Sequence, residues 1–478
     1  MGKKEDNQIT KHILNIGLST IINLVLGLIT TPIITRIVDP LEYGQLTMFN
    51  SYIAVSLSFV YFGLEEALIR FFYSYKNKSE QKSLLKLCVN IPLIFTIIAS
   101  IVFIILCKNK FVDIGYPTII IVLLCVDLLF SVWNKASTEM LQITYQSKKY
   151  SFTAVAQKIA YCLLAIGLIV VVKKNYFLML VLATTISTLV SACLGTYFTK
   201  DYWSFKNNKY PSNVNEILKY STPLYCYLLL MNLFDVTDKY LVKHFCGDYE
   251  IGIYGSAVAL VGIFSLIQTI FVIMWKPMQT DHYCNNPEDT SFIQKGNRYV
   301  TIIMFFVGIN VIMFKDVLCL MLGSDYRGAE SYIPFLVFNP VMYTIADTVT
   351  SGIEKSKKTY LHIVIIVICF AIEIFGSLYL IPRIGAKGAA ISLAVSLIAL
   401  YLLRLLFSNI YYPIDYGLNK TIVLIIVTLL FAYINTFYEI GIITIVTYIG
   451  CLIVLILLYL KDIKEMIEMF KSSLFNKQ

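Results

Sequence analysis

The sequence predicts an all-α polytopic membrane protein, and three observations support this fold class. Hydrophobic residues make up 58% of the 478 residues and charged residues only 14%, whereas soluble proteins carry roughly a quarter charged residues. The apolar runs reach the ~20 residues that a helix needs to cross a bilayer. They lack the ~10-residue alternating segments of a transmembrane β-barrel, and helices satisfy their backbone hydrogen bonds internally within lipid.

The apolar runs predict about 14 transmembrane helices, each ended by a short polar segment or by Gly and Pro. The narrowest separations lie at Lys173-Lys174-Asn175 and at Tyr438-Glu439. The expected spans are 12–37, 42–73, 84–107, 116–142, 151–173, 176–199, 217–243, 251–277, 296–315, 331–352, 360–381, 386–411, 420–437 and 440–460.

Lysines and arginines gather in alternate loops, which accounts for the net charge of +9 without a nucleic-acid partner. Because basic loops stay on the cytoplasmic side, both termini are expected in the cytoplasm. The N-terminal segment MGKKEDNQITKH is polar and leads directly into a full-length span, which is not the pattern of a cleaved secretory signal.

Several short patterns recur at nearly equal spacing and predict an internal duplication. Glu42-Tyr43-Gly44 recurs as Glu250-Ile251-Gly252, and Ser147-Lys148-Lys149 recurs as Ser356-Lys357-Lys358; Lys11 with Lys219 and Gly167 with Gly376 agree. The predicted parts are a six-helix lobe with its linker at 1–210, a second six-helix lobe at 211–412, and two extra helices with a tail at 413–478. An even number of spans inserts both lobes in the same direction, so a pseudo-twofold axis along the membrane normal and a cleft between the lobes are expected.

Charged residues inside the spans are candidates for function because charge in hydrocarbon is costly. Asp127, Lys158, Asp347 and Glu373 are expected to be deepest, and they favour a cavity or an ion-coupling role. The alternative for them is a protonated carboxyl or an internal ion pair, such as Asp127 with Lys158. Asp235, Asp238 and Lys239 share a helix face and fit either a functional site or a satisfied interface.

Other charges lie near the ends of spans. They either extend to the headgroups or form the polar mouth of a central cavity. Pairs four residues apart, Glu66 with Arg70 and Lys135 with Glu139, can meet on one helix face. This group comprises Arg36, Glu65, Glu66, Arg70, Lys135, Glu139, Lys276 and Arg404.

The sequence lacks motifs of soluble-type catalysis, namely a phosphate-binding Walker loop, HExxH, GxSxG or a zinc pattern. Its 11 cysteines are scattered through apolar runs without a CxxC pair, and we interpret them as small buried hydrophobic residues. No cofactor is therefore expected. Energy would come from an ion gradient, a substrate gradient or another protein.

Four stretches, taken in order, resemble bacterial polysaccharide transporters, the O-antigen and capsule flippases of the multidrug/oligosaccharidyl-lipid/polysaccharide exporter superfamily. They are Asp39-Pro40-x-Glu42-Tyr43-Gly44; Asp238-Lys239 followed by Gly252-Ile253-Tyr254-Gly255-Ser256-Ala257; Lys355-Ser356-Lys357-Lys358; and IPRIGAKGAA from Ile381 to Ala390. The resemblance implies two six-helix lobes around a cationic cavity, two extra C-terminal helices, and a flippase in the bacterial cytoplasmic membrane. Its expected substrate is an undecaprenyl-diphosphate-linked oligosaccharide, and polysaccharide polymerases or glycosyltransferases are expected partners.

On this resemblance, the candidate partners of the diphosphate are Arg36, Arg70, Lys135, Lys158, Lys276 and Arg404, since Arg and Lys suit phosphate groups. Few of these residues are deep in the spans. Related lipid II flippases hold sodium between helices seven, eleven and twelve, which maps to Asp235, Glu373, Ser392 and Ser396 here. The ion-coupling candidates are these four with Asp127 and Asp347, and the coupling ion would be sodium or a proton.

Two alternatives remain open at the level of sequence. A multidrug/cation antiporter of the same superfamily would suit a cavity lined by carboxylates such as Asp127 and Glu373. A membrane polysaccharide polymerase or ligase would need catalytic groups in a large outer loop, and the expected outer loops are short.

Overall fold

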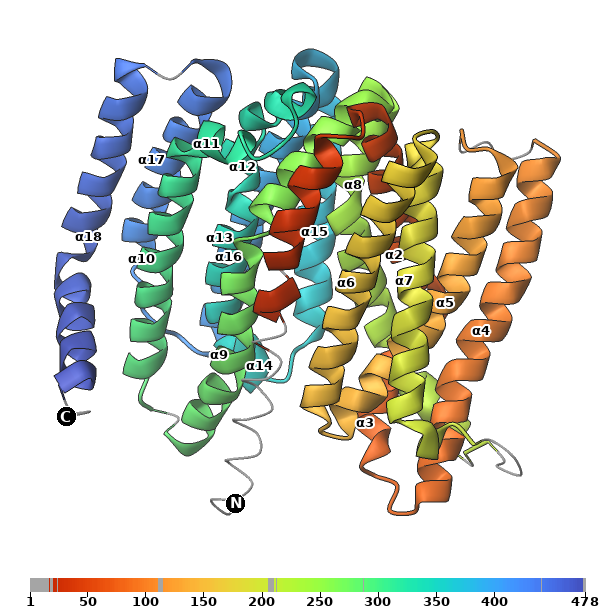
Figure 1. Ribbon diagram of the computed structural model, residues 1–478. Coiled ribbons are helices and arrows are strands. Elements are labelled where there is room, and N and C mark those ends of the chain that lie inside the picture. The colour runs from red at the N-terminus through yellow and green to blue at the C-terminus, as the bar shows by residue number, and fades with distance from the viewer. Residues whose placement is uncertain are drawn as a thin grey trace. The chain divides into compact units, whose positions relative to one another are not determined.

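The computed structural model describes residues 17, 20–23, 25–110, 115–204, 210–211, 213–286, 288–439 and 441–475, and these ranges contain helices and no strand. The chain divides into two compact units, Met1–Val236 and Thr237–Gln478 (Figure 1). Their boundary falls inside α8 (Val214–Val261), and the lobes expected at 1–210, 211–412 and 413–478 stay predictions. The all-α membrane fold predicted from composition is confirmed.

Unit 1, Met1–Val236, consists of long helices with short connections (Figure 1). Residues 20–23 and 25–35 are helical. The elements that follow are α2 (Pro40–Tyr61), α3 (Leu64–Phe72), α4 (Lys78–Lys108), α5 (Thr118–Ile143), α6 (Ser147–Val172), α7 (Tyr176–Phe198), the 3-10 turn η1 (Lys200–Tyr202) and the first part of α8 (Val214–Val261).

Unit 2, Thr237–Gln478, begins within α8. Its further elements are α9 (Ser265–Asn285), α10 (Ser291–Met313), α11 (Lys315–Cys319), η2 (Ser324–Ser331), α12 (Ile333–Leu336), α13 (Phe338–Thr348), α14 (Ser351–Lys355), α15 (Tyr360–Ile384), α16 (Ala386–Tyr411), α17 (Leu418–Phe437) and α18 (Ile442–Phe475).

Local sequence explains where several helices begin and end. The side chain of Asp39 caps α2 by accepting a 2.8 Å hydrogen bond from the Glu42 amide, with Pro40 in the first turn, a position that suits proline. Lys173 and Asn175 adopt positive φ between α6 and α7, so the expected separation of these two spans is confirmed. The separation of α17 from α18 is also confirmed.

Nine helices in the described part of the chain are long and apolar enough to span a membrane, or ten if the bent pair α2 and α3 counts as one. The span expected at 42–73 bends by 54° between α2 and α3, where Phe62 and Gly63 have φ of 53° and 70°. The span expected at 331–352 is divided among α12, α13 and α14. The expected break at 244–250 is confirmed at Gly247, whose φ of 87° and ψ of 179° are not helical, so α8 consists of two helices that meet there, and the second ends at Val261.

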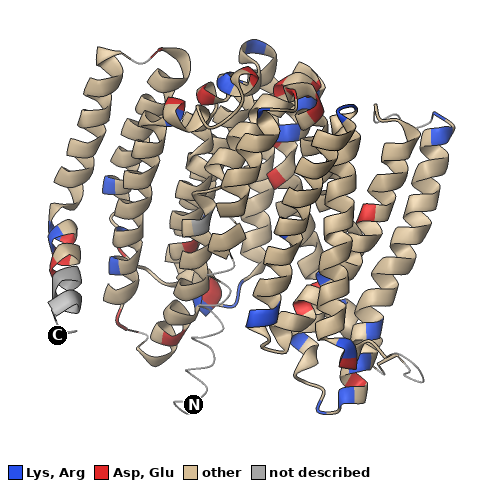
Figure 2. Ribbon diagram, viewed as in Figure 1, with Lys and Arg blue, Asp and Glu red and all other residues tan. Residues whose placement is uncertain are grey.

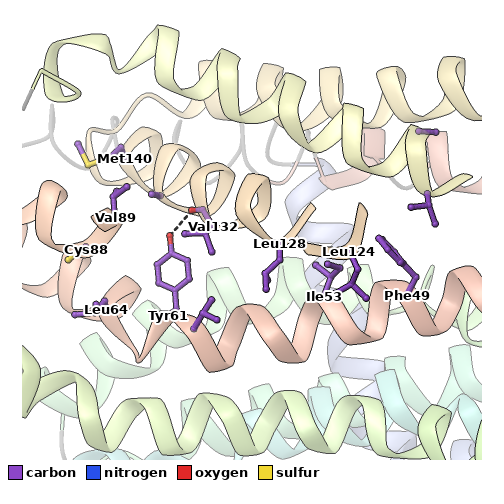
Figure 3. Packing of buried hydrophobic residues seen from close by; sticks show 14 of the residues in the cluster. Phe49, Ile53, Tyr61, Leu64, Cys88, Val89, Leu124, Leu128, Val132 and Met140 are labelled. Atoms are coloured by element: carbon purple, nitrogen blue, oxygen red, sulfur yellow. Dashed lines mark hydrogen bonds between the residues drawn. The ribbon is translucent and has the colours of Figure 1, made fainter. Parts of the chain in front are cut away.

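The core of unit 1 extends from α2 through α7 to the start of α8, and Figure 3 shows its part between α2, α3, α4 and α5. Tyr61, which is 1% exposed, donates a 2.9 Å hydrogen bond from its hydroxyl to the Val132 carbonyl on α5. Cys88 and Met140 are buried beside it. A buried tyrosine needs such a partner, so this bond fixes the end of α2 against α5 just before the bend.

Candidate functional site

Charged residues lie mainly near helix ends, and only a few interrupt the apolar helices (Figure 2). Each of those few needs a polar or oppositely charged partner, because its surroundings have a low dielectric constant.

The strongest buried charge pair of unit 2 joins α13 and α16. Arg404 Nη1 donates to Asp347 Oδ1 over 2.6 Å, and the two residues are 5% and 8% exposed. The guanidinium also lies over the Tyr343 ring, 5.6 Å from its centroid. Arg404 was expected near a span end and Asp347 deeper in its span, and the structure brings them together.

A second ion pair connects α9 with α14. Lys276 Nζ lies 3.0 Å from Glu354 Oε1, which also accepts a 3.0 Å hydrogen bond from Thr350. His362, near the start of α15, is within electrostatic reach of Arg404, Lys276 and Asp347. Both ion pairs therefore belong to one charged cluster, and neither base is left without an acidic partner.

Glu373 on α15 is fully buried, as is Ser396 on α16, and Ser392 is 2% exposed. The two serine hydroxyls donate to the Gly388 and Leu393 carbonyls over 2.8 and 2.7 Å, so their oxygens keep lone pairs for another donor or a cation. Glu373 interacts electrostatically with Tyr254. A carboxylate and two hydroxyl oxygens are hard ligands of the kind that small cations prefer.

The α8 carboxylate of this region is Asp238. Tyr254 donates a 2.8 Å hydrogen bond to Asp238 Oδ2, and Lys239 Nζ lies 3.5 Å from Asp238 Oδ1. Asp238 is 2% exposed, whereas Asp235, the residue selected from the sequence, is exposed. The positions of Asp235 and Asp238 differ by three residues, and only the fold distinguishes the buried one.

In unit 1 two buried glutamates share one lysine. Lys135 Nζ is 3.4 Å from Glu139 Oε1, which confirms the predicted pairing four residues apart, and Glu65 is within electrostatic reach of the same lysine. Glu65 and Glu139 are 8% and 7% exposed. Their Oε2 atoms have no hydrogen-bond partner among the described residues. The cluster joins α3 to α5 and is richer in carboxylates than in bases.

Asp127 lies in α5, about 14 Å from its start at the usual helical rise, and is 2% exposed. It is within hydrogen-bonding reach of Thr188 on α7, while its Oδ1 has no partner in the described ranges. The suggested ion pair with Lys158 is not among the ion pairs of the described residues. Lys158 lies over the Tyr161 ring, 5.5 Å from the centroid, and packs over Gly27.

Arg36 and Arg70 are both exposed. Arg36 follows the first helix, whose last turn includes a 3.2 Å bond from the Arg36 amide to the Pro32 carbonyl. The expected pair of Arg70 with Glu66 is not formed among the described residues. Arg70 instead lines a polar pocket of about 410 Å³ with Ser74, Glu216, Lys219 and Tyr220.

The sequence predicts no site role for Lys219, and it leaves Asp238, Glu65 and Glu139 open between a functional site and a satisfied interface or headgroup contact. A glycine within the apolar run, Gly63, signals the bend that turns Glu65 inward. Lys219 was noted only as part of the repeat. Groups of three or more His, Cys, Asp or Glu side chains that could hold a metal are absent from the described part of the chain.

Comparisons with known proteins agree with this architecture. A family model described as "Polysaccharide biosynthesis protein" matches residues 9–280, more than half of the chain. A search of curated proteins found no match.

Solved structures match along most of the chain. A lipid II flippase, MurJ, in an inward closed conformation has a TM-score of 0.66 at 14% identity, covering 95% of this chain and 99% of that chain. A MATE protein in the bent conformation has a TM-score of 0.59 at 13% identity, covering 87% and 97%. An inward-facing multidrug resistance MATE family transporter of the MOP superfamily has a TM-score of 0.56 at 15% identity, covering 84% and 97%.

These structures are a flippase and transporters rather than enzymes, and at these identities they establish the fold. The helical architecture, the charges buried within it and the match over residues 9–280 together lead to one assignment: the chain belongs to the polysaccharide biosynthesis protein family and has the fold of the MOP superfamily of transporters.

Proposed function

We propose that the chain is a flippase that moves undecaprenyl-diphosphate-linked oligosaccharide units from the inner to the outer leaflet of a bacterial cytoplasmic membrane by alternating access. The observation that carries this proposal is coverage: the lipid II flippase fold accounts for 95% of this chain, against 84–87% for the MATE folds named above. The product would supply surface polysaccharide such as O-antigen or capsule. Polymerases and glycosyltransferases would be its partners.

The basic residues support an anionic headgroup. Arg36 and Arg70 are exposed and make no ion pair within the described ranges, so they are available for diphosphate oxygens. Lys135, Lys276 and Arg404 already have acidic partners. They would contact substrate only after exchanging those partners.

Coupling to an ion gradient would use the buried carboxylates. Glu373 on α15 and Ser392 and Ser396 on α16, the helix packed against it, offer the oxygen ligands best suited to sodium, and Tyr254 interacts with both Asp238 and Glu373. Asp127 is a candidate proton carrier, since one of its oxygens has no partner among the described residues. Asp347 would take part in ion coupling by releasing Arg404. Asp235 would take part from its exposed position on α8.

Reconstitution of the full chain tests the proposal. Labelled undecaprenyl-diphosphate-oligosaccharide is placed in proteoliposomes and translocation is scored with an enzyme added outside, with and without a sodium or proton gradient. We expect gradient-dependent translocation that Glu373→Gln reduces. Lys148→Gln, at an exposed site on α6, is the control and should be normal. Wild-type vesicles without translocation under any gradient would refute the flippase.

A multidrug/cation antiporter is the second candidate. It is favoured by Glu65, Glu139 and Asp127 in unit 1, three buried carboxylates with an oxygen that lacks a partner among the described residues, because such groups attract cations. Efflux of a cationic dye from the same vesicles, together with absent lipid translocation, would establish it.

A further inference from the structure

Unit 1 contains a large apolar cavity in addition to the polar pocket of Arg70. The cavity has a volume of about 750 Å³ and is lined by residues of α2, α4, α5 and α8, a size typical of small-molecule sites. Its walls include Ser56, Phe59, Phe103, Cys125, Leu229 and Leu233. The lining side chains include no charged residue, so the cavity suits a hydrocarbon chain.

The cavity and the pocket are both lined by the segments α2–α3 and α8, and they follow one another in opposite chain order on the two segments. On α8, Lys219 and Tyr220 line the pocket, and Leu229 and Leu233 line the cavity. The helical rise separates Tyr220 from Leu229 by about 14 Å. On the opposite side, Arg70 belongs to the pocket and the earlier residue Phe59 to the cavity, so α2–α3 and α8 run antiparallel along one seam.

Aromatic rings follow the seam: Phe71 and Tyr220 line the pocket itself, and Phe62 and Tyr225 lie between the pocket and cavity residues along the chain. Phe71 packs edge-on against Tyr220 with centroids 5.6 Å apart, and Phe62 lies 5.5 Å from Tyr225. Phe62 also contacts Phe95 at 4.9 Å. Gly63 allows this approach, because a Cβ there would lie 2.6 Å from the Ser221 carbonyl oxygen of α8.

The polar pocket provides the complementary charge for an anion. Arg70 and Lys219 form no ion pair with other described residues, and the pocket's one acid, Glu216, accepts a 3.2 Å hydrogen bond from Asn213. Ser74 adds a hydroxyl donor. Two free bases near a hydroxyl match the chemistry of phosphate groups.

We propose that this seam binds the polyprenyl diphosphate anchor of the substrate, with the diphosphate on Arg70 and Lys219 and the isoprenoid chain passing the aromatic rings into the apolar cavity. The pocket lies at the end of α3 that the charge distribution predicts to be cytoplasmic, where a substrate assembled in the cytoplasm would load. The inference rests on the proposed function and adds to it a lipid site confined to unit 1.

The test uses the full-length protein in neutral phosphatidylcholine nanodiscs with a polyprenyl diphosphate that carries a photoreactive group in its chain. We expect cross-links on α2, α4 and α8 around Phe59, Phe103 and Leu229. Arg70→Gln with Lys219→Gln should weaken binding by about tenfold or more, since each lost contact is a hydrogen bond to charge. Lys148→Gln is the matched control and should bind normally.

Leu229→Trp should fill the cavity and remove the cross-links, and Val102→Phe serves the same purpose if the first variant does not fold. Cross-links elsewhere in a protein that still translocates substrate would overturn the lipid site proposed at the seam and would leave the proposed flippase function standing. Equal competition by phosphatidylglycerol or by inorganic diphosphate would also overturn it, because the site would then select only charge. Cross-linking at the seam without translocation would refute the flippase and keep the lipid site.

Discussion

Two charge clusters, one around Asp347 and Asp238 in unit 2 and one around Glu65 and Glu139 in unit 1, neutralise their buried charges differently. In unit 2, Asp347 is joined to Arg404 over 2.6 Å, and Asp238 is held by both Tyr254 and Lys239. In unit 1, Glu65 and Glu139 share a lysine whose side chain is 42% exposed, and each keeps an oxygen without a partner among the described residues. A closed ion pair resists change, whereas an incompletely paired carboxylate can exchange a proton or cation at lower cost.

This difference predicts which substitutions will cost the most stability. The Asp347–Arg404 pair joins α13 to α16, so its loss should destabilise unit 2 strongly. Glu65 and Glu139 are less completely paired, so neutralising one of them should cost less.

Breaking the Asp347–Arg404 ion pair should reduce the stability of the protein most. Arg404→Met leaves Asp347 as an uncompensated buried charge, which costs about 3–5 kcal/mol of unfolding free energy. Adding Asp347→Asn should recover part of that loss. The measurement is the thermal unfolding midpoint in detergent, with Lys276→Met, at a half-exposed pair, as the control. Equal midpoints for Arg404→Met and the control would show that the buried pair contributes no more to stability than the half-exposed pair.

A substitution at the bend between α2 and α3 should have the next largest effect on stability. Gly63→Ala places a side chain at φ +70°, which costs about 1–3 kcal/mol, and pushes against the Ser221 carbonyl oxygen. We expect a lower midpoint and weaker polyprenyl diphosphate binding. Gly167→Ala in α6, where an added Cβ meets nothing within 4 Å, is the control. A Gly63→Ala protein as stable as the Gly167→Ala protein would show that the bend tolerates displacement.

Neutralising Glu139 in unit 1 should cost little stability. Glu139→Gln removes a carboxylate with one partnerless oxygen, and Lys135 can be solvated, so we expect a change within about 1 kcal/mol. The dependence of the transport rate on pH or on sodium should nevertheless change. Unchanged ion dependence in the proteoliposome assay would exclude Glu139 from coupling.

The smallest effect is expected at the exposed pair of Lys78 with Asp201, 2.9 Å apart. Lys78 lowers the pKa of Asp201 from its ordinary value of 3.8. The pair therefore contributes above that value and is lost as the pH falls through the lowered pKa. Asp201→Asn should leave the midpoint at neutral pH almost unchanged, because exposed pairs contribute little. A clear drop at neutral pH would show that this pair is structural.

The membrane fold, most helix boundaries and the pairing of Lys135 with Glu139 can be predicted from the amino-acid sequence alone. These features depend on apolar length and on spacing along one helix, which are local properties. Tertiary structure decided that Asp347 meets Arg404, that Asp238 rather than Asp235 is buried, and that Arg70 shares a pocket with Lys219 instead of pairing with Glu66. Those contacts depend on how helices cross and on the bend at Gly63, and a linear pattern does not encode which of two neighbouring faces a second helix will cover.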